Sequence, residues 1–126
     1  MSGVTYDTGA LLAAEAGSQR MWKLHDGFLD QKRAVYVPAA VLAQAWRGGP
    51  QAKLSRLLNG CEVEALGEKE ARKTGAACKA GQTADVVDAS VVIGALSRGD
   101  IVITSDPGDL GRIADALGQR LTIQGV

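Results

Sequence analysis

Two aspartate side chains follow β-prone segments and are candidates for acid–base or metal chemistry. Asp7 comes directly after residues 4–6, and Asp106 comes two residues after residues 101–104, two short runs rich in β-branched side chains. In an open parallel sheet, ligand sites form beyond the carboxyl ends of the strands. We therefore expect both carboxylates to lie at the same edge of a sheet.

Two further aspartates open a strongly apolar segment, residues 86–96. Asp85 and Asp88 are three residues apart, which places both on one face of a helix. A buried ionised carboxylate is costly without a partner, and no basic residue occurs between Lys79 and Arg98. A divalent metal would neutralise this group, and an all-oxygen carboxylate site favours Mg²⁺ or Mn²⁺.

The elements that must position these aspartates alternate along the chain, with Gly and Pro residues between them. The patterns predict strands at residues 4–6, 34–37, 61–66, 101–104 and 121–123. They predict helices at residues 8–16, 21–29 (capped by Ser18), 39–46, 54–58, 68–79, 85–98 and 107–117. This alternation predicts a single α/β domain over residues 1–126, with a mainly parallel sheet and helices on both faces.

Composition argues against several classes of protein. The 126 residues are 46% hydrophobic and 22% charged, and the net charge of zero argues against a basic arm for nucleic acid. Two cysteines form no CxxC pair, and one histidine, His25, argues against a triad or a usual zinc site. We expect His25 on a helix surface. No segment is apolar enough to span a membrane, and the first residues lack the basic and apolar regions of a signal peptide. We therefore expect no secretory signal and a cytoplasmic protein without membrane contact.

Charges of opposite sign concentrate in different parts of the sequence. Eleven of the fourteen basic residues lie between Arg20 and Lys79, whereas six acidic residues lie between Asp85 and Asp115. An acidic site beside a basic surface suits an anionic substrate reached through a bound cation. The alternative is that these residues form ordinary solvated faces that happen to balance.

Each aspartate also has a purely structural interpretation. Asp106 can cap a helix that begins with Pro107, with Asp109 as its capping-box partner. Asp85 can interact favourably with the dipole of the helix that it opens. Convergence of four carboxylates on one sheet edge favours the functional interpretation over these local ones.

The sequence resembles the PIN-domain ribonucleases, in particular the VapC-type toxins of bacterial toxin–antitoxin pairs. The resemblance covers nearly the whole chain, and its strongest pieces are residues 4–12, 37–47, 85–89 and 104–110. It implies a three-layer domain around a five-stranded parallel sheet. It also implies a Mg²⁺- or Mn²⁺-dependent endoribonuclease that acts on RNA as a toxin, forms a homodimer and is restrained by a small antitoxin protein.

The resemblance assigns the acidic residues one by one. Asp7 matches the first acid of the family, Asp88 looks like the third and Asp106 matches the fourth, so these three are the candidate catalytic residues. Asp85 is an additional acid one helical turn before Asp88. The implied metal ligands are therefore Asp7, Asp85, Asp88 and Asp106, and which of Asp85 and Asp88 is the direct ligand stays open.

Three further positions are auxiliary candidates. Thr104 resembles a supporting hydroxyl, and Asp109 is a candidate for the metal or for orienting water. Gln44 departs from the family pattern, which usually has Glu at this position. An amide oxygen can coordinate a hard cation but carries no charge, so metal affinity should be lower unless Asp85 compensates. The alternative function is a weak or silent PIN-like protein that binds RNA or a protein partner.

Several exposed groups are candidates for contact with RNA. The basic residues that could hold flanking phosphates are Arg47, Lys53, Arg56, Arg72 and Arg112. Trp46 or Tyr36 could stack on unpaired bases, although an aromatic residue after an apolar run more often belongs to a core or a dimer contact.

Two other classes fit these residues less well. Residues 7–10 (Asp-Thr-Gly-Ala) also match the aspartic-protease tetrapeptide, but that fold is almost entirely β and at least five segments here have helical spacing. A phosphoacceptor receiver domain also holds Mg²⁺ at a sheet edge. It needs paired acids after its first strand, where this chain has only Asp7.

Overall fold

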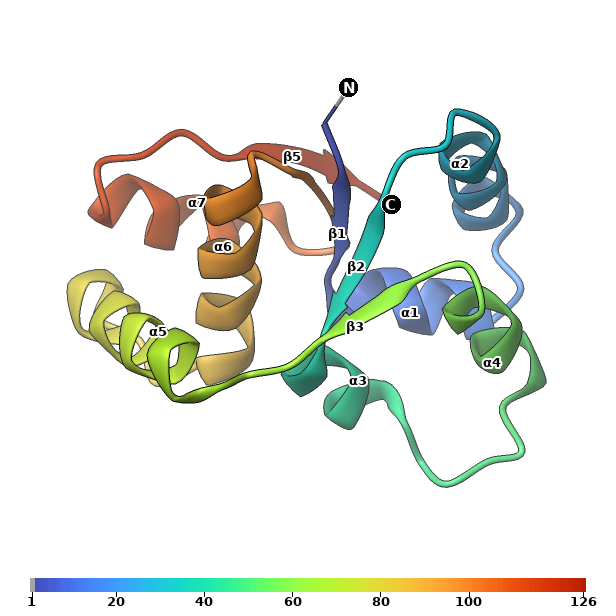
Figure 1. Cartoon of the computed structure of the whole chain (residues 1–126), viewed down its shortest axis with the longest axis horizontal. Helices are drawn as coiled ribbons and strands as arrows, with labels where there is room; N and C mark the ends of the chain where they lie inside the picture. The colour runs from blue at the N-terminus through green and yellow to red at the C-terminus, as the bar shows by residue number, and fades with distance from the viewer. Residues whose placement is uncertain (1) are drawn as a thin grey trace.

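The central sheet has five strands, and the computed structural model describes residues 2–126. The strands are β1 (Val4–Tyr6), β2 (Val35–Pro38), β3 (Glu62–Glu64), β4 (Ile101–Thr104) and β5 (Thr122–Gly125). Their order across the sheet is β3-β2-β1-β4-β5, and every neighbouring pair is parallel (Figure 1). The predicted α/β class and parallel sheet are confirmed.

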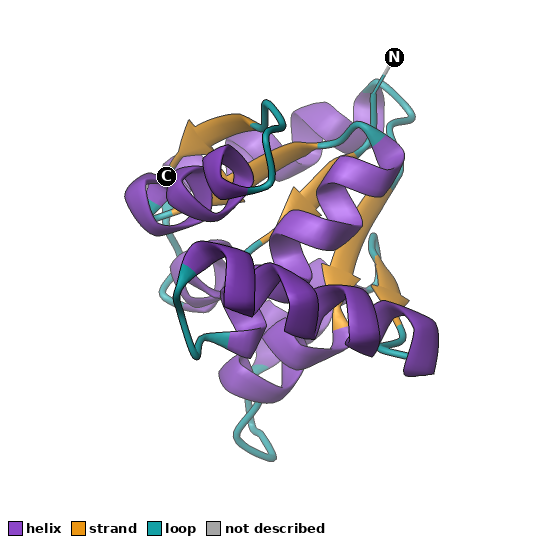
Figure 2. Cartoon of the chain, turned by 90° about the vertical axis from the view of Figure 1, so that its left-hand side faces the viewer, coloured by secondary structure: helices purple, strands orange, loops and turns teal. Residues whose placement is uncertain are grey.

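Helices cover both faces of this sheet. One face carries α1 (Thr8–Glu15), α2 (Gln19–Asp30), α3 (Ala39–Ala45) and α4 (Ala52–Leu58). The other carries α5 (Glu68–Gly81), α6 (Val86–Arg98) and α7 (Pro107–Ala116), as Figures 1 and 2 show. The layers are therefore helix, sheet and helix. No helix in residues 2–126 is long and apolar enough to cross a membrane.

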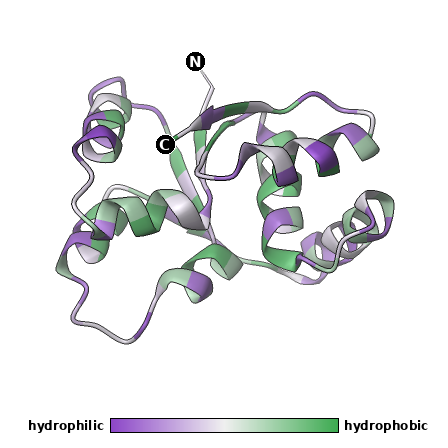
Figure 3. Ribbon diagram, turned by 180° about the vertical axis from the view of Figure 1, so that it is seen from behind, coloured by the Kyte–Doolittle hydropathy of each residue, from purple (hydrophilic) through white to green (hydrophobic). Residues whose placement is uncertain are grey.

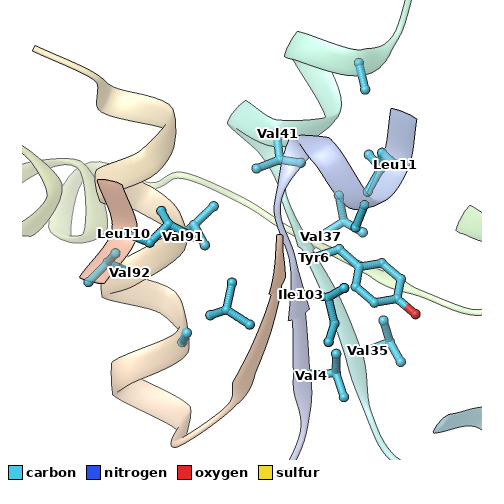
Figure 4. Packing of buried hydrophobic residues seen from close by; sticks show 14 of the residues in the cluster. Val4, Tyr6, Leu11, Val35, Val37, Val41, Val91, Val92, Ile103 and Leu110 are labelled. Atoms are coloured by element: carbon cyan, nitrogen blue, oxygen red, sulfur yellow. The ribbon is translucent and has the colours of Figure 1, made fainter. Parts of the chain in front are cut away.

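Apolar side chains fill the space on both sides of the strands. Tyr6 and Val37 point to the side of α1, whereas Val91 and Val92 of α6, with Leu110 of α7, pack on the opposite side (Figure 4). All five are fully buried. Burying a side chain of this size stabilises the fold by roughly 1.5–3 kcal/mol.

Helix α6 is the most enclosed of the helices. It contacts α5, α7 and the strands β1, β2 and β4, which explains why it is apolar on nearly every side. In Figure 3 the outer helices carry alternating hydrophobic and hydrophilic bands, as amphipathic helices do. Because α6 is held on all these sides, the acidic residues at its first turn are held at a defined place.

The order in which strands are added to the sheet reverses between β1 and β4, although all the strands remain parallel. From β1 the chain moves outward through β2 and β3, then crosses back through α6 to form β4 and β5 on the other side. In doubly wound sheets, the crevice at such a reversal is where ligands bind. Asp7 directly follows β1, and Asp106 stands two residues beyond β4, so both lie at this reversal.

An ion-pair network fixes the C-terminal end of α6. Arg98 Nε donates to the Asp100 carboxylate at 2.8 Å and Arg98 Nη2 donates to the Thr5 hydroxyl at 3.0 Å. The guanidinium also pairs with Glu64 and lies 3.9 Å from the centre of the Tyr36 ring. These contacts join the end of α6 to residues of β1, β2 and β3 and to Asp100, directly before β4, and so fix that end of the helix.

The structure contradicts the surface placement of His25. Only 2% of His25 is exposed, and its Nδ1 lies 2.8 Å from the Tyr6 hydroxyl oxygen. Burial lowers the pKa of this imidazole. Met21, His25 and Phe28 share the buried face of α2 at spacings of four and three residues. The apolar neighbours at that spacing were the signal that His25 belongs to the core.

Candidate functional site

The carboxylate of Asp7 is held by two hydrogen bonds at the end of β1. The Thr8 backbone N–H donates to Asp7 Oδ1 at 2.8 Å, and the Thr104 hydroxyl donates to Asp7 Oδ2 at 2.7 Å. Asp7 is only 6% exposed and serves as the N-cap of α1. Its orientation at the start of α1 is therefore fixed.

Thr104 links the ends of β1 and β4. Its fully buried hydroxyl donates to Asp7 and accepts the backbone N–H of Asp106 at 3.0 Å. Gly9 allows the start of α1 to approach this loop, because a Cβ at Gly9 would lie 2.9 Å from the backbone nitrogen of Ser105. The structure thus brings Asp7, Thr104 and Asp106 together, as the sequence analysis expected.

Asp85 and Asp88 have different roles and different exposure at the start of α6. Asp85 is the N-cap, and its Oδ1 accepts the Asp88 backbone N–H at 2.9 Å. Asp85 is exposed, whereas Asp88 is partly buried. The pKa of the Asp88 carboxyl is raised to about 7, chiefly by burial and then by the charges of Asp85, Asp7 and Asp109 in that order. The sequence analysis gave Asp85 a favourable interaction with the helix dipole, and the structure adds that its side chain caps α6. The raised pKa belongs to Asp88.

Asp106 occupies the N-cap position of α7 but does not cap it. Its side chain makes no capping hydrogen bond, and Pro107 follows at the first helical position. The pKa of Asp106 is raised, chiefly by a side-chain hydrogen bond with Asp109 and then by the charge of Asp109. The exposed Asp106 carboxyl is therefore influenced by the neighbouring acid Asp109 and does not cap the helix.

Gln44 is connected to the site by a hydrogen bond with Thr8. The Thr8 hydroxyl donates to Gln44 Oε1 at 2.6 Å, while the Thr8 backbone N–H holds Asp7. Gln44 lies on α3 and is exposed. The sequence analysis missed Thr8, whose contact with Gln44 depends on how α3 packs beside α1.

A pocket of about 260 Å³ opens beside these residues. Its lining includes Asp85, Asp88 and Asp109 together with Thr83 and Arg112. The structure therefore has two acidic groups. The pocket group contains Asp85, Asp88 and Asp109, and the strand-end group contains Asp7 and Asp106. The two groups interact electrostatically, because the charge of Asp7 contributes to raising the pKa of Asp88 and the charge of Asp109 contributes to raising the pKa of Asp106.

The donor chemistry of these groups fits a hard divalent cation. All the candidate side chains offer oxygen atoms, and the raised pKa of Asp88 reflects burial and uncompensated neighbouring charge that a cation would offset. Within residues 2–126, however, no three His, Cys, Asp or Glu side chains come close enough together to hold a metal ion. The residues therefore suit a divalent cation by their oxygen donors and their charge, and not by a three-residue arrangement.

Several solved structures share this architecture. A chain of VapBC2 from Rickettsia felis, bound to a DNA fragment from its promoter, superposes with a TM-score of 0.74 at 13% identity and 98% coverage of both chains. For DNA-bound VapBC from Salmonella typhimurium, the TM-score is 0.70 at 17% identity, covering 99% of this chain and 98% of that one. The chain has the PIN fold.

A third structure with the PIN fold supports the same conclusion. FitAB bound to a DNA fragment superposes with a TM-score of 0.68 at 13% identity, covering 97% of this chain and 94% of that chain. At the level of sequence, no family model matches the chain, and no curated protein matches it either. At these identities the likeness establishes the fold.

Proposed function

We propose that this protein is a Mg²⁺- or Mn²⁺-dependent endoribonuclease that hydrolyses RNA phosphodiester bonds as the toxin of a toxin–antitoxin pair. The observation that carries the proposal is the gathering of aspartates at the reversal of the sheet, where burial and the neighbouring acids raise the pKa of Asp88 to about 7. The likeness to VapBC and FitAB in fold supports it.

Asp7, Asp88 and Asp106 would hold the divalent cation, with Asp85 as a further ligand candidate. Bound Mg²⁺ or Mn²⁺ would supply a water molecule of lowered pKa and positive charge beside the phosphate. Thr104 and the Thr8 N–H keep the Asp7 carboxylate in one orientation. Such fixed positioning is what a nuclease site requires, because little of the rate enhancement then depends on rearrangement.

The partners of this activity are also part of the proposal. The resemblance to VapC-type toxins and the VapBC composition of the similar structures support restraint by a small antitoxin protein. Homodimerisation rests on the resemblance alone. In this role the protein would act on cytoplasmic RNA.

Cleavage of a mixed pool of structured RNAs tests the proposed activity. We expect cutting with Mg²⁺ or Mn²⁺, none with EDTA, and a loss of at least about a hundredfold in Asp7→Asn, equivalent to about 3 kcal/mol of barrier. Asp115→Asn is the matched control because Asp115 is an exposed acid on α7 that lies outside both acidic groups. Equal activity of wild type and Asp7→Asn would contradict the proposed site.

A silent PIN-like binding protein is the second candidate. It is favoured by Gln44, which brings no charge to the site, and by the lack of a three-residue metal group in residues 2–126. Under this alternative, folded wild type cuts no RNA at millimolar Mn²⁺ and yet binds RNA or a partner protein. Cutting gained by Gln44→Glu would then identify the missing carboxylate as the reason for silence.

A further inference from the structure

Arg112 lies beside the acidic pocket. It is one turn after Asp109 on α7, and its Nη2 pairs with Asp109 Oδ1. Among the described residues that line the pocket, Arg112 is the one basic side chain, facing the same space as Asp85 and Asp88. A substrate phosphate drawn to a cation among these carboxylates would therefore arrive next to a guanidinium.

The other basic candidates from the sequence lie elsewhere. The Arg56 guanidinium lies 4.2 Å from the centre of the Trp22 ring, and Arg72 pairs at 2.9 Å with a glutamate on its own exposed helix face. Arg47 donates to the carbonyl oxygen of its neighbouring residue at 2.7 Å. None of these three side chains lines the acidic pocket.

The pair between Arg112 and Asp109 contributes little to stability. The side chains of Arg112 and Asp109 are 67% and 48% exposed, and such surface pairs contribute between about zero and 1 kcal/mol. A guanidinium has five N–H donors, and the hydrogen bond to Asp109 uses one of them. Most of its donors are therefore available to a ligand, and exchanging Asp109 for that ligand costs little.

We propose that Arg112 binds a phosphate of the RNA substrate at the mouth of the acidic pocket, and that Asp109 holds the guanidinium there until the phosphate displaces it. The planar guanidinium can offer two parallel N–H groups to phosphate oxygens, which a point charge cannot match. This inference rests on the proposed function, because it names the group that recognises the substrate of the same site.

The test measures binding separately from cleavage. Fluorescence anisotropy with a labelled random-sequence single-stranded RNA, in EDTA and at low salt, compares wild type with Arg112→Ala, Arg112→Lys and Arg72→Ala. We expect Arg112→Ala to weaken binding about tenfold, and Arg112→Lys to recover part of the loss. Arg72→Ala removes the same charge from an exposed pair and should weaken binding less than about twofold.

A salt titration separates a phosphate contact from a general charge effect. The slope of log affinity against log salt should become shallower by about one in Arg112→Ala, as expected for one lost phosphate contact. Melting temperatures of all variants should match wild type, since both pairs are exposed. Equal weakening by Arg112→Ala and Arg72→Ala, or unchanged binding by Arg112→Ala, would overturn the inference.

The same proteins distinguish this inference from the nuclease proposal. If wild type cuts RNA and Arg112→Ala binds it equally well, the inference fails while the proposed function stands. If wild type binds RNA through Arg112 but does not cut with Mn²⁺, the nuclease fails while the inference stands. If wild type binds no RNA in EDTA, the inference fails, and the nuclease proposal fails with it when the same protein also cuts no RNA with Mn²⁺.

Discussion

The two ends of α6 hold acidic groups in opposite ways. At the C-terminal end, Asp100 is 4% exposed, accepts the Thr5 hydroxyl at 2.8 Å and is paired with Arg98 at 2.8 Å. The negative charge there is neutralised by a cation supplied by the chain itself. Such an arrangement needs no outside ligand.

At the N-terminal end, the acids face one another. Asp88 is near Asp85, Asp7 and Asp109, and the pKa of its carboxyl is raised to about 7, first by burial and then by these charges. The nearby cation, Arg112, is already shared with Asp109. Strongly shifted pKa values are concentrated at functional sites, so the contrast favours the N-terminal end of α6 as the candidate site.

Removing the cation of the Arg98–Asp100 pair, at the C-terminal end of α6, should have the largest effect on stability. Arg98→Ala leaves the Asp100 carboxylate buried without its cation, and we expect a loss of about 3–5 kcal/mol in the free energy of unfolding. Urea denaturation followed by circular dichroism measures this loss. Asp100→Asn in the same chain should recover part of it.

Arg72→Ala is the control for this variant, because its pair with Glu68 is 79–80% exposed on both sides. We expect it to change stability by less than about 0.5 kcal/mol. If Arg98→Ala were equally mild, the C-terminal network would not be what holds α6 in place.

Removing a negative charge at the N-terminal end of α6 should increase stability, whereas removing Arg98 should decrease it. Asp88→Asn should stabilise the metal-free protein by about 1–2 kcal/mol at pH 8, less than the full pKa shift implies because Asp88 is only partly buried. The unfolded chain ionises Asp88 near pH 3.8 and the folded chain near pH 7, so stability falls as pH rises between these values.

Thermal melts from pH 4 to pH 8 check this dependence. The difference between wild type and Asp88→Asn should be near zero at pH 4 and largest above pH 7. Saturating Mn²⁺ should stabilise wild type more than the variant. A constant difference across the pH range would mean that the side chain acts through packing rather than charge.

The sequence was most informative where local pattern decides the structure. Asp7 after β1, Asp85 and Asp88 at the start of α6, and Asp106 after β4 were all predictable, because strand ends and helix starts are local features. The partner of Asp7 was not derivable from spacing. The Thr104 hydroxyl that holds it is 97 residues away and meets it only because β1 and β4 are neighbours.

Burial was harder to predict than element boundaries. His25 occupies a helix as expected, but the face of α2 that turns inward depends on where Tyr6 and the rest of the sheet lie. Likewise, the sequence did not separate Asp85 from Asp88. Their different roles come from the cap hydrogen bond and from how far each side chain enters the interior.

A negative charge at position 44 should make the acidic end of α6 differ more from the neutralised end. Gln44→Glu keeps an oxygen for the Thr8 hydroxyl and brings a further carboxylate near Asp7. We expect Mn²⁺ binding about tenfold tighter, because affinity for hard cations rises with ligand charge. Isothermal titration calorimetry measures this change, and Gln119→Glu, at an exposed position, serves as the control. Unchanged affinity would place residue 44 outside the metal site.

Asp85→Asn should have the smallest effect on stability. This variant removes the charge of Asp85 but keeps its capping hydrogen bond. Asparagine accepts the Asp88 N–H as aspartate does, so α6 keeps its cap and stability should change by less than about 0.5 kcal/mol, whereas Asp85→Ala should cost about 1 kcal/mol. The pKa of Asp88 should fall only part of the way to its ordinary value, because burial is the larger cause of its shift. A carboxyl-detected NMR titration measures that pKa. A return to about 3.8 would show that repulsion from Asp85, and not burial, is what makes this end of α6 differ from the other.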